Sequence, residues 1–141
     1  MNRIIRQEQM HEIAQELCAS MPDTKIFTFS GPLGAGKTTL VQQILRACGI
    51  TEPITSPTYT YVNVYRHNDN TYYHFDLYRL EGLDDFIQAG FDEYLYQPNS
   101  YCFIEWPEIM ETLLKESIYK VTISYDTEVT RLITMEKNEQ L

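Results

Sequence analysis

Residues 31–38 have the types and spacing of a loop that binds the phosphates of a nucleotide. They fit the pattern G-x-x-x-x-G-K-S/T at every position. Because glycine has no side chain, the backbone can wrap around a polyphosphate and point successive N–H groups at it. Lys37 would reach the outer phosphates, and the hydroxyl of Thr38 would bind Mg²⁺. The residues expected to contact the nucleotide are Leu33, Gly34, Ala35, Gly36, Lys37, Thr38 and Thr39.

Two apolar runs end in an acidic residue, and these acids are the candidates for the rest of the site. Asp76 follows residues 72–75, and Glu105 follows residues 101–104. The second run is continuously apolar, as expected for a central strand covered on both faces. We therefore expect Glu105 to bind Mg²⁺ together with Thr38, and Asp76 to activate water or contact the metal indirectly. The alternative for either acid is a residue that only caps a strand or helix.

Three further positions give weaker signals. Trp106 either lines the nucleotide site or is a half-buried packing residue. His74 lies on the strand that leads to Asp76, and we expect it to be a packed, hydrogen-bonded strand residue. Residues 56–58 either sense the γ-phosphate, as switch segments do, or show ordinary turn chemistry around Pro57.

The sequence around the loop predicts the elements that must position these residues. Residues 26–30 form a short run of β-forming residues, and residues 40–48 repeat apolar side chains at helical spacing before Gly49. Strand, glycine turn and helix is the order that the motif needs, and the helix N-terminus adds a partial positive charge. A glycine-rich turn that binds nothing is the weaker alternative in this context.

The remaining pattern predicts an α/β fold. We expect one P-loop NTPase-type domain over residues 1–141, with helices on both sides of a sheet that mixes parallel and antiparallel strands. The expected elements are a helix over 10–21, a hairpin of 59–66 and 71–76, two short helical pieces within 83–95, a central strand over 101–104, a helix from 107 to about 116, and closing strands over 119–125 and 128–135.

Composition limits the possible partners. The chain has 141 residues, of which 43% are hydrophobic, and its net charge is −9 from 20 acidic and 11 basic residues. It has no cluster of Lys or Arg, so direct binding of nucleic acid is not expected. Three widely spaced cysteines, no signal-peptide core and no membrane-length apolar run predict a reduced, cytoplasmic protein without a membrane segment.

Three classes of nucleotide-binding protein are alternatives for this sequence. A small-molecule kinase normally has an arginine-bearing lid, whereas the arginines after the loop are scattered at Arg46, Arg66, Arg79 and Arg131. A GTP switch needs D-x-x-G and N-K-x-D segments, and the sequence has neither. An ATPase that acts on a partner assembly needs no substrate pocket and suits a chain of this size. The kinase remains the alternative.

Five segments taken together resemble one family. Residues 31–39, 55–60, 73–80, 91–95 and 104–108, in this order, are similar to the TsaE family, formerly YjeE. Its members are small bacterial ATPases of tRNA threonylcarbamoyladenosine biosynthesis. The phosphate loop is generic, but the segments His-Phe-Asp-Leu-Tyr-Arg and Glu-Trp-Pro-Glu are specific. The resemblance extends from about residue 8 to residue 135.

The resemblance implies a cytoplasmic, Mg²⁺-dependent ATPase that is weak alone and works with the proteins TsaD and TsaB. ATP hydrolysis would reset the complex between turnovers, and tRNA would be met only through the partners. Lys37 would hold phosphates, Thr38 and Glu105 would bind Mg²⁺, and Asp76 would lie by the γ-phosphate as base or water-orienting group. Residues 56–58 would form the switch-like loop.

The sequence departs from the family pattern at two places, and one further residue has a role that the family pattern does not define. The family often has Asn-Glu-Tyr where this chain has Asn-Val-Tyr at residues 63–65. The family's adenine contacts from the N-terminal segment have no evident counterpart in residues 7–10. Arg131 is expected to approach the nucleotide from the C-terminal strands.

Overall fold

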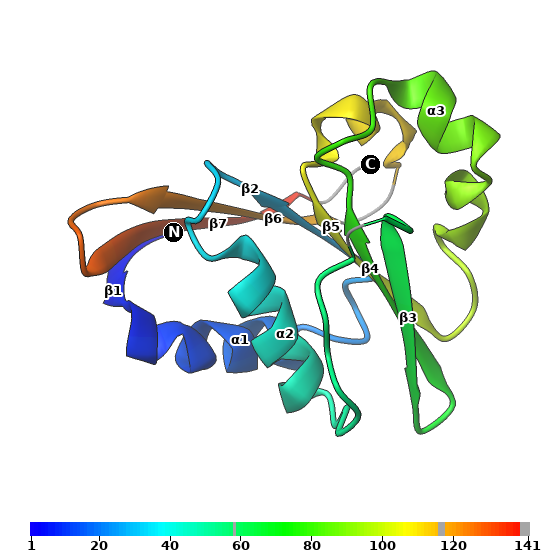
Figure 1. The fold of residues 1–141 in the computed structure, drawn as a ribbon. Helices are drawn as coiled ribbons and strands as arrows, with labels where there is room; N and C mark the ends of the chain where they lie inside the picture. Colours follow the sequence, from blue (N-terminus) through cyan, green and yellow to red (C-terminus); the bar gives the residue numbers. More distant parts are fainter. Residues whose placement is uncertain (58, 116–117, 139–141) are drawn as a thin grey trace.

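The computed structural model describes residues 1–57, 59–115 and 118–138, and one continuous sheet runs through this part of the chain. The sheet has seven strands in the order β1-β7-β6-β2-β5-β4-β3 (Figure 1). The elements in chain order are β1 (Asn2–Arg6), η1 (Gln7–Gln9), α1 (Met10–Ala19), β2 (Ile26–Ser30), α2 (Lys37–Ala47), β3 (Val62–His67), β4 (Asn70–Asp76), α3 (Leu83–Gln88), η2 (Phe91–Tyr94), β5 (Ser100–Glu105), η3 (Pro107–Ile109), η4 (Glu111–Leu113), β6 (Ile118–Tyr125) and β7 (Thr130–Asn138).

The centre of the sheet is parallel and its edges are antiparallel. Strands β6, β2, β5 and β4 run in the same direction, whereas β3, β7 and β1 each pair with a neighbour in the opposite direction. The carboxyl ends of parallel strands meet at one edge of a sheet. The register accordingly places both Phe29 of β2 and Asp76 of β4 opposite Glu105 of β5.

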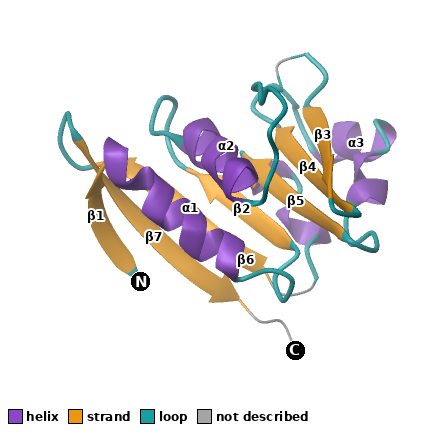
Figure 2. Ribbon diagram, turned by 90° about the horizontal axis from the view of Figure 1, so that it is seen from below, coloured by secondary structure: helices purple, strands orange, loops and turns teal. Residues whose placement is uncertain are grey.

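Helices cover both faces of the sheet, as the sequence predicts. Figure 2 shows α1 and α2 side by side on one face, with α3 and the nearby short turns on the other. The α1–α2 side contains Phe27, Phe29 and Phe103, and the α3 side contains Phe75 and Ile104. Successive strand residues face opposite sides of a sheet, so each central strand contributes to both clusters. This burial on both faces explains why β2 and β5 are apolar runs.

The predicted elements are confirmed, with ends that differ by up to three residues, except at two places. The predicted helix over 107–116 is wrong: the chain makes two 3₁₀ turns, η3 and η4, and Glu116 lies outside the described residues. Met110 leaves the helical backbone at φ −129° and is fully buried in the α3-side cluster, so packing overrides local propensity. The strand β1 was not predicted, because only Ile5 of its five residues is buried.

Gly31 joins β2 to the phosphate loop and allows a close approach of two backbones. Its φ is 144°, and a Cβ at this position would lie 2.0 Å from the carbonyl oxygen of Ile123 in β6. We expect Gly31→Ala to cost on the order of 3 kcal/mol of unfolding free energy, because both the φ angle and the contact must relax.

Urea unfolding followed by circular dichroism checks this prediction. Gly82→Ala is the matched control, since a Cβ on Gly82 meets nothing within 4 Å, and its midpoint should stay near that of the wild type. Equal midpoints for the two variants would show that β6 does not constrain the start of the loop.

Candidate nucleotide site

The phosphate loop borders a cleft at the carboxyl edge of the parallel strands. Gly34 and Gly36 have positive φ angles of 77° and 116°, and α2 begins directly after them at Lys37. We call this cleft the loop cleft; its walls are formed by Gln7, Leu33, Gly34, Gly36, Lys37, Thr38, Thr39, Asp76, Glu105 and Trp106. All three residues expected to carry catalysis therefore border the same hollow as most of the phosphate loop.

The ammonium group of Lys37 lies inside the loop itself. Its Nζ donates hydrogen bonds to the carbonyl oxygens of Gly31 and, at 2.9 Å, Pro32. The same Nζ lies 4.0 Å from the ring centroid of Trp106, a cation–π contact. Burial lowers the pKa of Lys37 below its ordinary value, and the negative charge of Glu105 opposes this shift. A phosphate oxygen would thus replace neutral carbonyl partners with a charged one, which strengthens the hydrogen bond.

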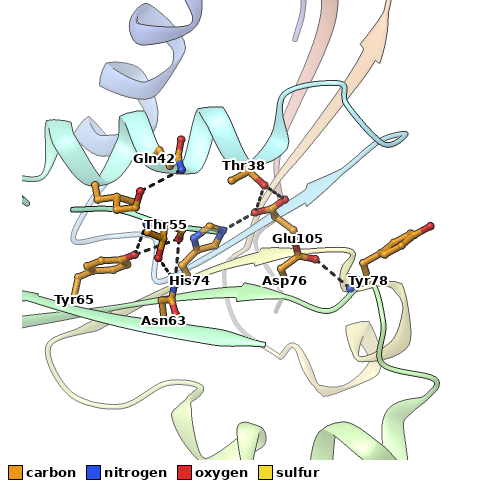
Figure 3. Close-up of polar contacts among 10 residues, drawn as sticks. Thr38, Gln42, Thr55, Asn63, Tyr65, His74, Asp76, Tyr78 and Glu105 are labelled. Atoms are coloured by element: carbon orange, nitrogen blue, oxygen red, sulfur yellow. Dashed lines mark hydrogen bonds and ion pairs between the residues drawn. The ribbon is translucent and has the colours of Figure 1, made fainter. Parts of the chain in front are cut away.

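Glu105 forms a hydrogen-bonded group with residues from two other elements (Figure 3). The hydroxyl of Thr38 in α2 donates to the carboxylate, with Oγ1 2.8 Å from Oε1 and 3.0 Å from Oε2. Nε2 of His74 in β4 lies 2.5 Å from Oε2. Mg²⁺ prefers oxygen ligands and is commonly held by one or two protein groups together with substrate phosphates. The hydroxyl of Thr38 and the carboxylate of Glu105 fit this requirement.

Asp76 is the neighbour of Glu105 across the β4–β5 ladder. Its Oδ1 accepts a hydrogen bond from the backbone N–H of Tyr78 at 3.2 Å. Burial raises the pKa of Asp76, and the nearby charge of Glu105 raises it further. A raised pKa at a position beside the phosphate loop is compatible with the general-base role expected for Asp76, which stays a prediction.

Trp106 forms one wall of the loop cleft. Its backbone is left-handed, with φ 58° and ψ 59°, and its N–H donates to the carbonyl oxygen of Phe29 at 3.2 Å. The ring contacts both the ammonium of Lys37 and the ring of Tyr78, whose centroid is 4.9 Å away. The sharp turn after β5 therefore directs Trp106 toward the phosphate loop, and its contact with a nucleotide stays a prediction.

Arg131 of β7 supports the backbone of the phosphate loop through a hydrogen bond. Its Nε donates to the carbonyl oxygen of Ala35 at 3.2 Å, and its guanidinium lies 4.6 Å from the ring centroid of Tyr125. The hydroxyl of Tyr125 donates to the carbonyl oxygen of Leu33 at 2.7 Å. Neither Arg131 nor Ala35 is among the residues that line the loop cleft. Direct contact of these two residues with a nucleotide stays a prediction.

Gln7 lines the loop cleft, although residues 7–10 show no evident counterpart of the family's adenine contacts in the sequence. It also borders an adjoining hollow between α1 and α2, together with Glu8, His11, Gln15, Gln43, Arg46 and Ala47. The side-chain Oε1 of Gln43 is buried there without a hydrogen-bond partner among the described residues. Only the packing of α1 against α2 brings these residues together, so local spacing could not reveal the hollow.

The loop that follows α2 also lies near Asp76, because both border one hollow. Pro57 and Tyr61 line a third hollow with Leu33, Asp76, Tyr78 and Arg79. The start of this loop is fixed by β3, because Nδ2 of Asn63 lies 3.0 Å from the carbonyl oxygen of Thr55. Ser56 is exposed, and Thr58 of the expected switch-like segment lies outside the described residues.

Comparison with known proteins identifies the family. Residues 4–133 match the model of the family described as "Threonylcarbamoyl adenosine biosynthesis protein TsaE". The chain belongs to the TsaE family. It therefore belongs among proteins of tRNA threonylcarbamoyladenosine biosynthesis, and the recognition made from the five sequence segments is confirmed.

Similar proteins cover most of the chain. The TsaE protein of Treponema pallidum is 42% identical over 104 residues, which are 74% of this chain and 74% of that protein. The TsaE protein of Bacillus subtilis is 32% identical over 132 residues, or 94% of this chain and 82% of the relative. The crystal structure of YdiB from Bacillus subtilis is 28% identical and has a TM-score of 0.70, covering 96% of this chain and 84% of YdiB. The predicted α/β fold is thus confirmed.

No helix among the described residues has both the length and the apolar character needed to span a membrane.

Proposed function

We propose that this TsaE-family chain is an Mg²⁺-dependent ATPase that works in the cytoplasm with the proteins TsaD and TsaB. ATP hydrolysis would reset that complex between rounds of tRNA modification. The observation that carries the proposal is the convergence of Lys37, the Thr38–Glu105 pair and Asp76 on one cleft bordered by a complete phosphate loop.

The residues of the loop cleft suit the successive needs of phosphoryl transfer. The loop N–H groups and Lys37 would hold the β- and γ-phosphates, and Thr38 and Glu105 would hold Mg²⁺, which neutralises charge on the phosphates. Asp76 would orient the attacking water and accept its proton. The hollow that begins at Gln7 offers space for the nucleoside next to the phosphate site.

The charge of the chain favours an indirect relation to tRNA. A net charge of −9 repels a polyanion, and the sequence has no basic cluster to offset this. The tRNA would then be bound by the partners, while this chain contributes nucleotide turnover. Its exposed Leu33 and Tyr78, at 60% and 51% of full exposure, border a hollow beside the candidate nucleotide site and would be available to a partner protein.

ATP hydrolysis by the purified chain, with and without purified TsaD–TsaB, tests the proposal. We expect slow turnover alone, at least tenfold stimulation by the pair, and loss of both rates in excess EDTA. A filter-binding titration at physiological salt should detect no tRNA binding by the chain alone. Hydrolysis that the pair leaves unchanged would contradict the partner role, and phosphoryl transfer to a small molecule would support the kinase alternative instead.

A further inference from the structure

His74 is a fully buried polar residue directly behind the candidate metal ligand Glu105. The side chain of His74 is 0% exposed, and it is not among the residues that line the loop cleft. Figure 3 shows the carboxylate of Glu105 between the hydroxyl of Thr38 and the imidazole of His74. Of the two groups that contact the carboxylate, Thr38 comes from α2 and His74 from β4.

The sheet register explains this contact. His74 pairs with Phe103, and Asp76 pairs with Glu105. Alternate residues of a strand share a face, so all four side chains lie on the α1–α2 side of the sheet. His74 is therefore the diagonal neighbour of Glu105, within reach of a long side chain. Because the imidazole is enclosed in the sheet and the core, it cannot swing away as a surface side chain can.

The hydrogen-bond roles in the pair are unequal. The carboxylate can only accept, so Nε2 of His74 donates to Oε2 of Glu105 over 2.5 Å. Nδ1 is buried and has no hydrogen-bond partner among the described residues. A buried N–H without a partner is costly. This arrangement favours the tautomer with its proton on Nε2, which fixes the direction of the donor.

We infer that His74 is a positioning residue that holds the carboxylate of Glu105 in the orientation in which it binds Mg²⁺ with Thr38. The inference rests on the proposed Mg²⁺–nucleotide function. By holding Oε2 from the buried side, His74 keeps Oε1 next to the hydroxyl of Thr38. Removing a partner that orients a metal ligand typically costs 10- to 100-fold in metal affinity. A histidine that only fills the core would have no such effect.

A pair of substitutions separates positioning from packing. His74→Leu removes the donor and keeps an apolar side chain, whereas His74→Gln places an N–H near the position of Nε2. His67→Leu is the matched control, because His67 lies at the far end of the β3–β4 hairpin, next to Gly49. Mg²⁺ is titrated into each protein with saturating ADP, and the fluorescence of Trp106, the only tryptophan, is followed. ADP affinity is also measured by calorimetry in EDTA.

We expect His74→Leu to weaken Mg²⁺ binding by 10- to 100-fold and to leave ADP affinity in EDTA within twofold of wild type. His74→Gln should restore Mg²⁺ affinity to within a few-fold, and His67→Leu should match the wild type. Wild-type Mg²⁺ affinity in His74→Leu would overturn the inference. An equal loss of ADP affinity in EDTA would also overturn it, because that result indicates a structural role.

Two further outcomes are distinguishable. If His74→Leu does not fold, His74→Asn replaces it: its shorter amide cannot reach Oε2, so weaker Mg²⁺ binding than in His74→Gln supports the inference, and equal binding overturns it. If the wild type itself binds ADP without any dependence on Mg²⁺, the proposed function fails, and the inference fails with it. The inference about His74 fails by itself, with the proposed function intact, only when folded variants bind Mg²⁺ as the wild type does or lose ADP affinity in EDTA.

Discussion

Lys37→Ala is expected to lower the rate of ATP hydrolysis by at least 100-fold. The ammonium already lies within the phosphate loop, where Gly31 and Pro32 supply its carbonyl partners. Its charge would stabilise the negative charge on the transferring phosphoryl group, and losing one such donor typically costs 10²- to 10³-fold in rate. Alanine also opens the space between the loop and Trp106. Both effects lower turnover, so the partner-stimulated rate should fall with the basal one.

Steady-state hydrolysis in the presence of TsaD–TsaB, with calorimetric ADP binding, measures the effect. Lys25→Ala is the matched control: the Nζ of Lys25 lies 4.7 Å from the ring centroid of Tyr101, outside the loop cleft. The control loses a lysine and a cation–π contact of the same kind, yet its turnover should equal that of the wild type. Turnover of Lys37→Ala within a few-fold of this control would remove Lys37 from the catalytic site.

The sequence predicts the part of the site that depends on local spacing. Phosphate-loop glycines, Lys37 and Thr38 are fixed by a contiguous motif. Asp76 and Glu105 are also predictable, because each follows an apolar run and the carboxyl ends of parallel strands meet. The structure brings all four onto one cleft. Their roles with a nucleotide and Mg²⁺ stay predictions that the proposed measurements test.

The sequence does not predict the parts that depend on packing between distant elements. The contact of His74 with Glu105 spans 31 positions and requires the β4–β5 register. Gln7 reaches the cleft only because the chain turns after the edge strand β1. Arg131 donates a hydrogen bond to the backbone of Ala35, 96 positions away. The presence of an arginine at this position does not by itself indicate that contact. Such contacts follow from strand order and helix packing, which no local window of sequence contains.

Asp76→Asn should separate hydrolysis from binding. The amide keeps the shape of the side chain, and its oxygen can still accept from the N–H of Tyr78. It cannot accept a proton from water, so we expect hydrolysis to slow by about 10²- to 10⁴-fold while ATP affinity stays within a few-fold of wild type. Calorimetry and single-turnover hydrolysis measure the two effects. A large loss of ATP affinity would instead assign Asp76 to nucleotide binding.

The same variant should be more stable than the wild type when no nucleotide is present. Burial and the charge of Glu105 raise the pKa of Asp76, so the folded state binds this proton more tightly than the unfolded state. The stability that protonated Asp76 contributes is therefore present at low pH and is lost as pH rises through the raised pKa. Asp76→Asn avoids that loss, so its melting temperature should exceed the wild-type value at neutral pH and approach it in acid.

The exposed residue Asp84 provides the matched control, since Asp84→Asn should change neither turnover nor this pH dependence. Slower hydrolysis together with higher stability would show that the carboxylate of Asp76 costs the fold free energy and serves the reaction. An unchanged melting temperature with slow hydrolysis would support the catalytic role of Asp76 but contradict the prediction that its charge destabilises the fold. Slow hydrolysis with a lower melting temperature would instead indicate that the substitution damages the β4–β5 edge on which Glu105 depends.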